Sequence, residues 1–241
     1  MTAPLISITL RALLNRRRTL LLALLGALLV VVAVIYRLGN PTAAESVDVT
    51  RRLLANFGIG VLLPLVAVIV GTSALGSELD DGTIVYLLAK PVARWRIALV
   101  KLVVAWLVTC VLVAPAMLIA GVIGQEDPQL AIGYAVASIL GALEYTAMFM
   151  ALSLLTSRAL IIGLAYVVVW EGVVAGLFSG TRAVSVRQHA LAVAESLGGA
   201  GAGDAGLAFG FAVAAGAAVT MAAIALAIRR LETVELRGET T

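Results

Sequence analysis

Six long apolar runs constrain the fold of this 241-residue chain more than any other feature of its sequence. Each run holds 20 to 23 residues, and Lys and Arg lie only at the ends, except for Lys101 near the start of the third run. A helix of ~20 residues, rising 1.5 Å per residue, crosses the ~30 Å hydrocarbon core of a bilayer. The runs are Thr19–Leu38, Leu54–Gly76, Ile97–Ile119, Ala131–Ser153, Ala159–Phe178 and Leu207–Ile228.

The composition agrees with lipid as the main solvent. Apolar residues make up 62% of the chain and charged residues only 13%, whereas soluble domains carry roughly 25% charged residues. Strands of a membrane barrel alternate in polarity and take about 10 residues, so these uniform runs favour helices. We therefore predict an all-α integral membrane protein with six transmembrane helices and no separate soluble catalytic domain.

The placement of Lys and Arg predicts the orientation of these helices. Twelve basic residues fall in the N-terminal segment, the second-to-third and fourth-to-fifth connections and the C-terminal tail, whereas five fall on the other side. Positive charge is retained in the cytoplasm, so the side with twelve basic residues is expected inside, and an even number of spans puts both ends there. The abundance of Ala and Gly favours a bacterial source, and hence a bacterial inner membrane. The five basic residues on the other side are Arg37, Arg51, Arg52, Arg182 and Arg187.

We divide the chain into residues 1–18, the six-span domain 19–228 and a cytoplasmic tail 229–241. Leu5–Arg18 has an apolar stripe with arginines outside it, which predicts a helix lying at the cytoplasmic interface; the same arginines could serve only to set topology. A cleaved signal peptide is disfavoured because its apolar region takes 7–15 residues, and the first run has 20.

The cytoplasmic connection 77–96 is the most informative stretch. Asp81-Gly82 indicates a turn, Thr83 can cap a short helix, and Lys90 and Pro91 suit its last turn and its end. Ile84, Leu87 and Leu88 then share one face. From these residues alone, either a docking helix or an ordinary ordered loop is possible.

This connection resembles the signature of ABC-2 type transporter permeases. The resemblance lies in Glu78, Asp80, Gly82-Thr83, Leu87-Leu88-Ala89, Pro91-Val92, Arg94 and Lys101. Ala93 stands where the family usually has Ser, and a small residue suffices there. The six-span layout and the basic N-terminal segment agree with the same family.

The resemblance implies a permease subunit of an ATP-driven exporter. Two permease subunits would pair as a homo- or heterodimer, and a separate nucleotide-binding subunit would bind to them. The chain has no G-x-x-x-x-G-K-[ST] phosphate loop, so we expect no ATP site of its own and ATP and Mg on the partner. The resemblance implies that the connection 77–96 is a coupling helix, which would contact that partner. Its transmission residues would be Glu78, Asp80, Asp81, Gly82, Thr83, Leu87, Leu88, Lys90, Pro91 and Arg94.

Two carboxylates, Glu144 and Glu171, lie inside predicted spans. An ionised carboxylate at the bilayer centre costs a few kcal/mol. They could line the translocation path or only join helices. Gly172, Gly176 and Gly180 follow at four-residue spacing, which suits close helix approach, and the family often breaks its fifth span here.

The outer connection 179–206 predicts a short amphipathic helix on the outer surface, carrying Ala190, Leu191, Ala194 and Leu197, followed by a glycine-rich link. His189, the only histidine, is expected to be an exposed loop residue. Pro64 and Pro115 are expected to kink their spans. The one cysteine, Cys110, excludes an intramolecular disulfide.

Other membrane functions explain fewer features of the sequence. An intramembrane protease lacks the required G-x-S-x-G or H-E-x-x-H motif, and a haem carrier lacks a second histidine. An ion- or proton-driven secondary transporter using Glu144 and Glu171 is the alternative, although it leaves the connection 77–96 unexplained. A non-transporting membrane anchor is also compatible, and the transported substrate is not predicted by the sequence.

Overall fold

A computed structural model describes residues 9–10, 13, 16–80, 93–125, 128–175, 179–199 and 206–238. Most of the predicted interfacial helix and residues 81–92 of the predicted coupling helix lie outside these residues. The described part is helical and contains no strand, as expected for a chain whose backbone must satisfy its hydrogen bonds inside lipid.

The helices follow the apolar runs closely. They are α2 (Arg16–Leu38), α3 (Ala43–Arg52), η1 (Leu53–Leu62), α4 (Leu63–Asp80), α6 (Arg94–Gly124), α7 (Pro128–Ser153), α8 (Ala159–Ala165), η2 (Tyr166–Val174), η3 (Ser179–Val184), α10 (Val186–Leu197) and α11 (Phe209–Gly238). η1 and η2 are π-helical and η3 is a 3-10 helix.

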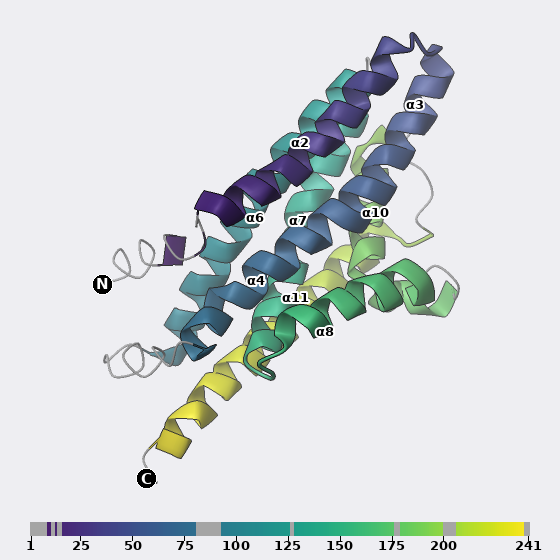
Figure 1. Ribbon diagram of the computed structural model, residues 1–241. Helices are drawn as coiled ribbons and strands as arrows, with labels where there is room; N and C mark the ends of the chain where they lie inside the picture. Colours follow the sequence, from purple (N-terminus) through teal and green to yellow (C-terminus); the bar gives the residue numbers. More distant parts are fainter. Residues whose placement is uncertain are drawn as a thin grey trace.

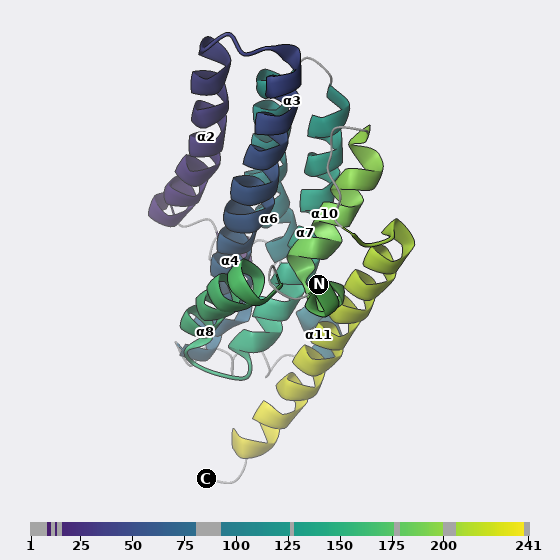
Figure 2. The ribbon, with the colours of Figure 1, turned by 90° about the vertical axis from the view of Figure 1, so that its right-hand side faces the viewer.

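The long helices run along one another in an elongated bundle (Figures 1 and 2). α3, η1 and α4 form one continuous rod, because the residues that join them, Leu53 and Leu63, keep right-handed helical dihedrals. We call the end where α2 begins, α4 ends and α6 begins the basic end, after the arginines near it, and the other end the opposite end. α7 returns from the opposite end to the basic end and contacts α4, α6, α8, α10 and α11.

Glycines allow the closest approaches to α7. A Cβ at Gly121 of α6 would lie 2.6 Å from the Cβ of Ala131, and one at Gly71 of α4 would lie 3.1 Å from the carbonyl oxygen of Thr146. Small residues at such crossings let helix backbones approach and gain dispersion energy, which drives packing in lipid. α7 thereby becomes the centre of the bundle.

The predicted count of six simple spans is not confirmed. Five helical segments are long and apolar enough to cross a membrane: Arg18–Leu38, Ala43–Gly76, Arg94–Gly124, Pro128–Ser153 and Phe209–Thr233. The fifth predicted run forms only the shorter apolar helix Ala159–Val174, about 24 Å long at 1.5 Å per residue, which is less than the ~30 Å core.

The described part of the fifth run instead lies beside the start of another helix inside the bundle. α8 and η2 rise from the basic end, and α10 begins where η2 has placed Glu171 (Figure 1). α10 then climbs α7 toward the opposite end: Ala190 lies opposite Gly141, and Gly198, just after α10, lies opposite Gly133.

This arrangement corrects the prediction for residues 179–206. The helix expected on the outer surface is α10, and it is buried, with Val186, Ala190, Val193 and Ala194 each at most 2% exposed. Of the predicted glycine face after Glu171, the structure describes Gly172 and Gly180 and not Gly176, and neither described glycine has a close neighbour on another helix. A Cβ at Gly180 would meet nothing within 4 Å, and one at Gly172 would meet only the carbonyl oxygen of Val167 in its own segment.

Candidate functional site

Among the described residues, buried or half-buried carboxylates with hydrogen-bonded partners inside the bundle lie near the basic end and near the middle. Of the predicted coupling residues, the structure describes the ends of the connection: Glu78 and Asp80 at the end of α4, and Arg94 at the start of α6. The others, Asp81, Gly82, Thr83, Leu87, Leu88, Lys90 and Pro91, lie outside the described residues.

An ion pair joins the two helices that flank this connection. The Lys101 Nζ of α6 lies 2.6 Å from the Glu78 Oε1 of α4 and donates a second hydrogen bond to the Ala74 carbonyl oxygen at 2.8 Å. The Lys101 side chain is 2% exposed and that of Glu78 is 18% exposed. A buried charge requires such a partner, so the end of α4 and the start of α6 are held together.

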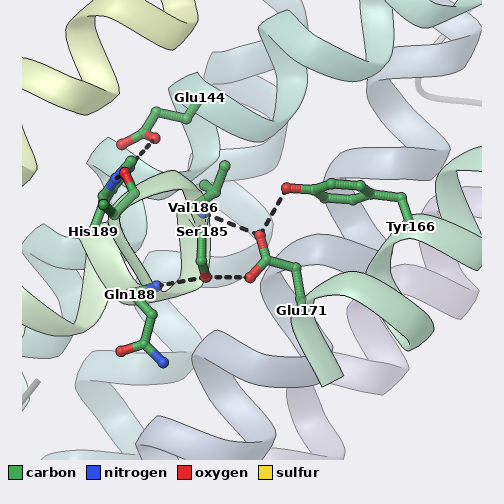
Figure 3. Close-up of polar contacts among 8 residues, drawn as sticks. Glu144, Tyr166, Glu171, Ser185, Val186, Gln188 and His189 are labelled. Carbon is green, nitrogen blue, oxygen red and sulfur yellow. Dashed lines mark hydrogen bonds and ion pairs between the residues drawn. The ribbon is translucent and has the colours of Figure 1, made fainter. Parts of the chain in front are cut away.

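Near the middle of the bundle, Glu171 of η2 caps the first turn of α10. Its Oε1 accepts the backbone N–H of Val186 at 3.0 Å and the hydroxyl of Tyr166 at 2.9 Å, and its Oε2 accepts the hydroxyl of Ser185 (Figure 3). Glu171 is 2% exposed. A carboxylate at a helix N-terminus is favoured by the free N–H groups and by the helix dipole.

The local sequence explains why α10 begins at this point. Ser185 has extended backbone dihedrals, and its side chain accepts the N–H of Gln188 at 3.2 Å, which is an N-cap. In water the remaining N–H groups of the first turn would bind solvent. Inside a membrane they need protein acceptors, and Glu171 supplies one from a segment 15 residues earlier.

A second pair lies next to this cap. The His189 Nδ1 of α10 is 2.9 Å from the Glu144 Oε2 of α7, and the His189 Nε2 is 3.1 Å from the Ala183 carbonyl oxygen. His189 is 1% exposed, so the prediction of an exposed loop histidine is wrong. Because it faces α7 from the apolar side of α10, it meets the carboxylate instead of solvent (Figure 3).

The structure thus brings Glu144 and Glu171 into one region, each engaged with the first turn of α10. Sequence reasoning missed their partners His189, Ser185 and Tyr166. Two signals for them exist: Ser185 is followed three residues later by Gln188, a capping pattern, and His189 falls in register with Val186, Ala190 and Val193 on a helical stripe.

The chemistry of this region is hydrogen bonding and ion pairing. Among the described residues no group of three or more His, Cys, Asp and Glu side chains could hold a metal ion. Glu171 stabilises the start of α10 inside the bundle. Glu144 pairs with His189 and lies against Gly216 of α11.

Comparison with known proteins identifies a family relationship. A family model described as ABC-2 family transporter protein matches residues 14–198, which is more than half of the chain. No curated protein matches the chain. The matched range includes the ion pair at the basic end, the central carboxylates and α10.

Proposed function

Because the chain belongs to the ABC-2 transporter family, we propose that it is the permease subunit of an ATP-driven exporter. Two permease subunits, identical or not, would form the translocation path. A separate nucleotide-binding subunit would hold ATP and Mg and supply the energy. The family is a membrane component of transporters, and this multi-pass helical bundle suits that role.

The coupling role falls on the connection between α4 and α6. Its residues Glu78, Asp80–Thr83, Leu87–Leu88, Lys90–Pro91 and Arg94 would receive the movement of the nucleotide-binding subunit. What carries this proposal is the pair of Glu78 and Lys101, which joins the two helices flanking the connection at 2.6 Å. A displacement of the connection would therefore move α4 and α6 together, and both pack on α7.

The proposed orientation follows from charge. Arg18, Arg94, Arg96, Arg158 and Arg229 belong to helix ends or connections at the basic end of the bundle. Positive residues are retained on the cytoplasmic side, so we place the basic end in the cytoplasm of a bacterial cell, where a nucleotide-binding subunit has access to ATP. Both chain ends would then be cytoplasmic.

Secondary transport driven by ions or protons is the weaker candidate. It requires Glu144 and Glu171 to bind and release a coupling ion. Glu171 already accepts three hydrogen bonds, and removing them would uncap α10. The family relationship does not favour this alternative.

The direct test is to co-express the chain with candidate nucleotide-binding subunits and to purify the complex through a tag on the chain. We expect an ATPase to co-purify, and the double substitution Leu87→Asp and Leu88→Asp to release it or uncouple it while the membrane fold persists. Export from vesicles that is sustained by a proton gradient after ATP depletion would contradict the proposal. So would an L87D/L88D complex that assembles and transports normally.

A further inference from the structure

A cavity of about 280 Å³ lies between α7, α10 and α11. Its walls are mostly apolar, with Leu143 and Val193 on one side and Ala217 on the other, and its polar groups are Glu144, His189 and Thr220. Leu140, Val213 and Met221 at its rim are exposed, so the cavity opens on the outer surface of the bundle, where lipid would reach it. Cavities near this size with apolar walls and few polar groups are typical of small-molecule sites.

Glu144 supplies an unused hydrogen-bond acceptor at this cavity. Its side chain is 8% exposed, its Oε2 is paired with His189, and the described residues place no hydrogen-bond donor on its Oε1. Figure 3 shows that oxygen directed away from His189, toward α11. A buried carboxylate oxygen without a donor is costly, and a ligand in the cavity would supply one.

Gly216 of α11 makes room for this carboxylate. A Cβ at position 216 would lie 2.6 Å from the Glu144 Cδ, so any larger residue would displace the carboxylate or close that part of the cavity. Thr220 lies one turn further along α11 and lines the same cavity. It offers a hydroxyl that can donate or accept.

The hydrogen bonds of His189 limit the charge of such a ligand. The Ala183 carbonyl oxygen can only accept, so the His189 Nε2 must carry a hydrogen. The contact of 2.9 Å between Nδ1 and Oε2 then needs one further proton shared by the pair. Glu144 and His189 together are therefore neutral, and a charged ligand would bring an uncompensated charge into the membrane interior.

We propose that this cavity binds an uncharged amphipathic molecule, with an apolar body among the side chains of α7, α10 and α11 and one hydroxyl or similar group donating to Glu144. The molecule would enter from the bilayer, because the rim faces outward. This site is independent of the proposed export function: it requires only the folded chain in a lipid environment.

The test uses 1-decanol carrying a diazirine in its chain as a photoreactive probe, with the full chain in phosphatidylcholine nanodiscs. Matched probes are decane, decylammonium and decanoate with the same diazirine. We expect the alcohol to label peptides of α7, α10 and α11 saturably, excess 1-decanol to compete, and the other three to label them weakly. Glu144→Leu should weaken the binding of the alcohol about tenfold, the effect of one hydrogen bond to a charged group.

A second variant separates binding from folding. Ala217→Phe adds a ring at the α11 wall of the cavity and removes neither Glu144 nor His189. It should abolish labelling, whereas Ala218→Phe, at an exposed position of α11 outside the cavity lining, should not. Equal labelling by decane, stronger labelling by decylammonium, or full labelling of A217F would overturn the proposal. A disulfide-linked dimer formed through Met221→Cys would also overturn it, because this face would then be an interface between copies.

Discussion

Glu171 accepts the backbone N–H of Val186 at 3.0 Å, so that a side chain of one helical segment completes the first turn of another within the bundle. The two segments are η2, which ends at Val174, and α10, which begins at Val186, with the 3-10 helix η3 (Ser179–Val184) between them. A helix end exposed to hydrocarbon would leave several N–H groups unbonded. The carboxylate therefore allows α10 to begin inside the bundle.

Replacing Glu171 by Leu should destabilise the chain by about 2 kcal/mol or more. The substitution leaves the Val186 N–H and the Ser185 hydroxyl without this acceptor, and each buried unsatisfied group costs about 1–3 kcal/mol. Glu171→Gln keeps one acceptor oxygen and should lose less. The measurement is the free energy of unfolding in mixed micelles during titration with a denaturing detergent.

Val173→Leu is the control for this pair of variants, because Val173 lies two residues further along η2 and is exposed. It should unfold like the parent chain. A Glu171→Leu chain that is as stable as V173L would mean that α10 does not depend on its cap.

The sequence predicted most of the architecture because hydropathy reports directly on lipid as solvent. The first four runs and the last each form one helical segment that is long and apolar enough to cross a membrane. The fifth does not, because its apolar composition fits a full crossing helix and also a shorter helix followed by the buried helix α10. That choice depends on tertiary hydrogen bonds to Ser185 and Val186, which spacing along the chain does not encode.

His189 shows the same limit at the level of one residue. The sequence places His189 in register with Val186, Ala190 and Val193, whereas the predicted apolar face consists of Ala190, Leu191, Ala194 and Leu197. The partner of His189, Glu144, is 45 positions away. Only the packing of α10 on α7 brings the two together.

Breaking the ion pair at the basic end should uncouple transport from ATP hydrolysis. Lys101→Met leaves the Glu78 carboxylate without its partner in a site where only 18% of that side chain is exposed, and loss of one member of a buried pair costs about 3 kcal/mol. We expect transport per ATP hydrolysed to fall severalfold in vesicles containing the complex. The charge-exchanged chain with Glu78→Lys and Lys101→Glu should recover part of it.

Arg96→Met is the matched control for that experiment. It also removes a positive charge near the start of α6, but Arg96 is exposed and lies over the ring of Trp95, 5.1 Å from its centre. Its transport per ATP should stay near the parental value. If R96M and K101M behave alike, the effect comes from the general positive charge of this end and not from the pair.

The crossing of α6 and α7 should not tolerate a side chain at Gly121. In Gly121→Ala the new Cβ would lie 2.6 Å from that of Ala131, so the helices must separate, and we expect a loss of about 1–3 kcal/mol. Gly210→Ala meets nothing within 4 Å and should be neutral or more stable by up to about 1 kcal/mol, because Ala favours helix over Gly. Thermal unfolding of both variants in the same detergent compares them.

Glu144 and His189 should behave as a coupled pair. Removing either one leaves a buried polar group unpaired, so Glu144→Leu and His189→Leu should each lose about 3 kcal/mol of unfolding free energy, whereas the double variant should lose clearly less than the sum. A double-mutant cycle on purified protein measures the difference. Additive losses would show that the two side chains act independently despite their 2.9 Å contact.

Whether the chain crosses the membrane six times can be tested at the start of α8 and at the end of α10. If α8 and η2 together with α10 make one crossing, Ser157 before α8 and Ser196 near the end of α10 lie on opposite sides of the membrane. Both are exposed. In a Cys110→Ser background, Ser196→Cys should react with an impermeant maleimide in intact cells, and Ser157→Cys only after permeabilisation.

Two further positions calibrate this labelling. Asn40→Cys, between α2 and α3 at the opposite end, should react like Ser196→Cys, and Thr233→Cys, near the end of α11, should react like Ser157→Cys. Labelling of Ser157→Cys and Ser196→Cys on the same side would instead make η2 and α10 a re-entrant pair, which leaves five crossings. The ends of the chain would then face opposite compartments, and the placement of both in the cytoplasm would fail with it.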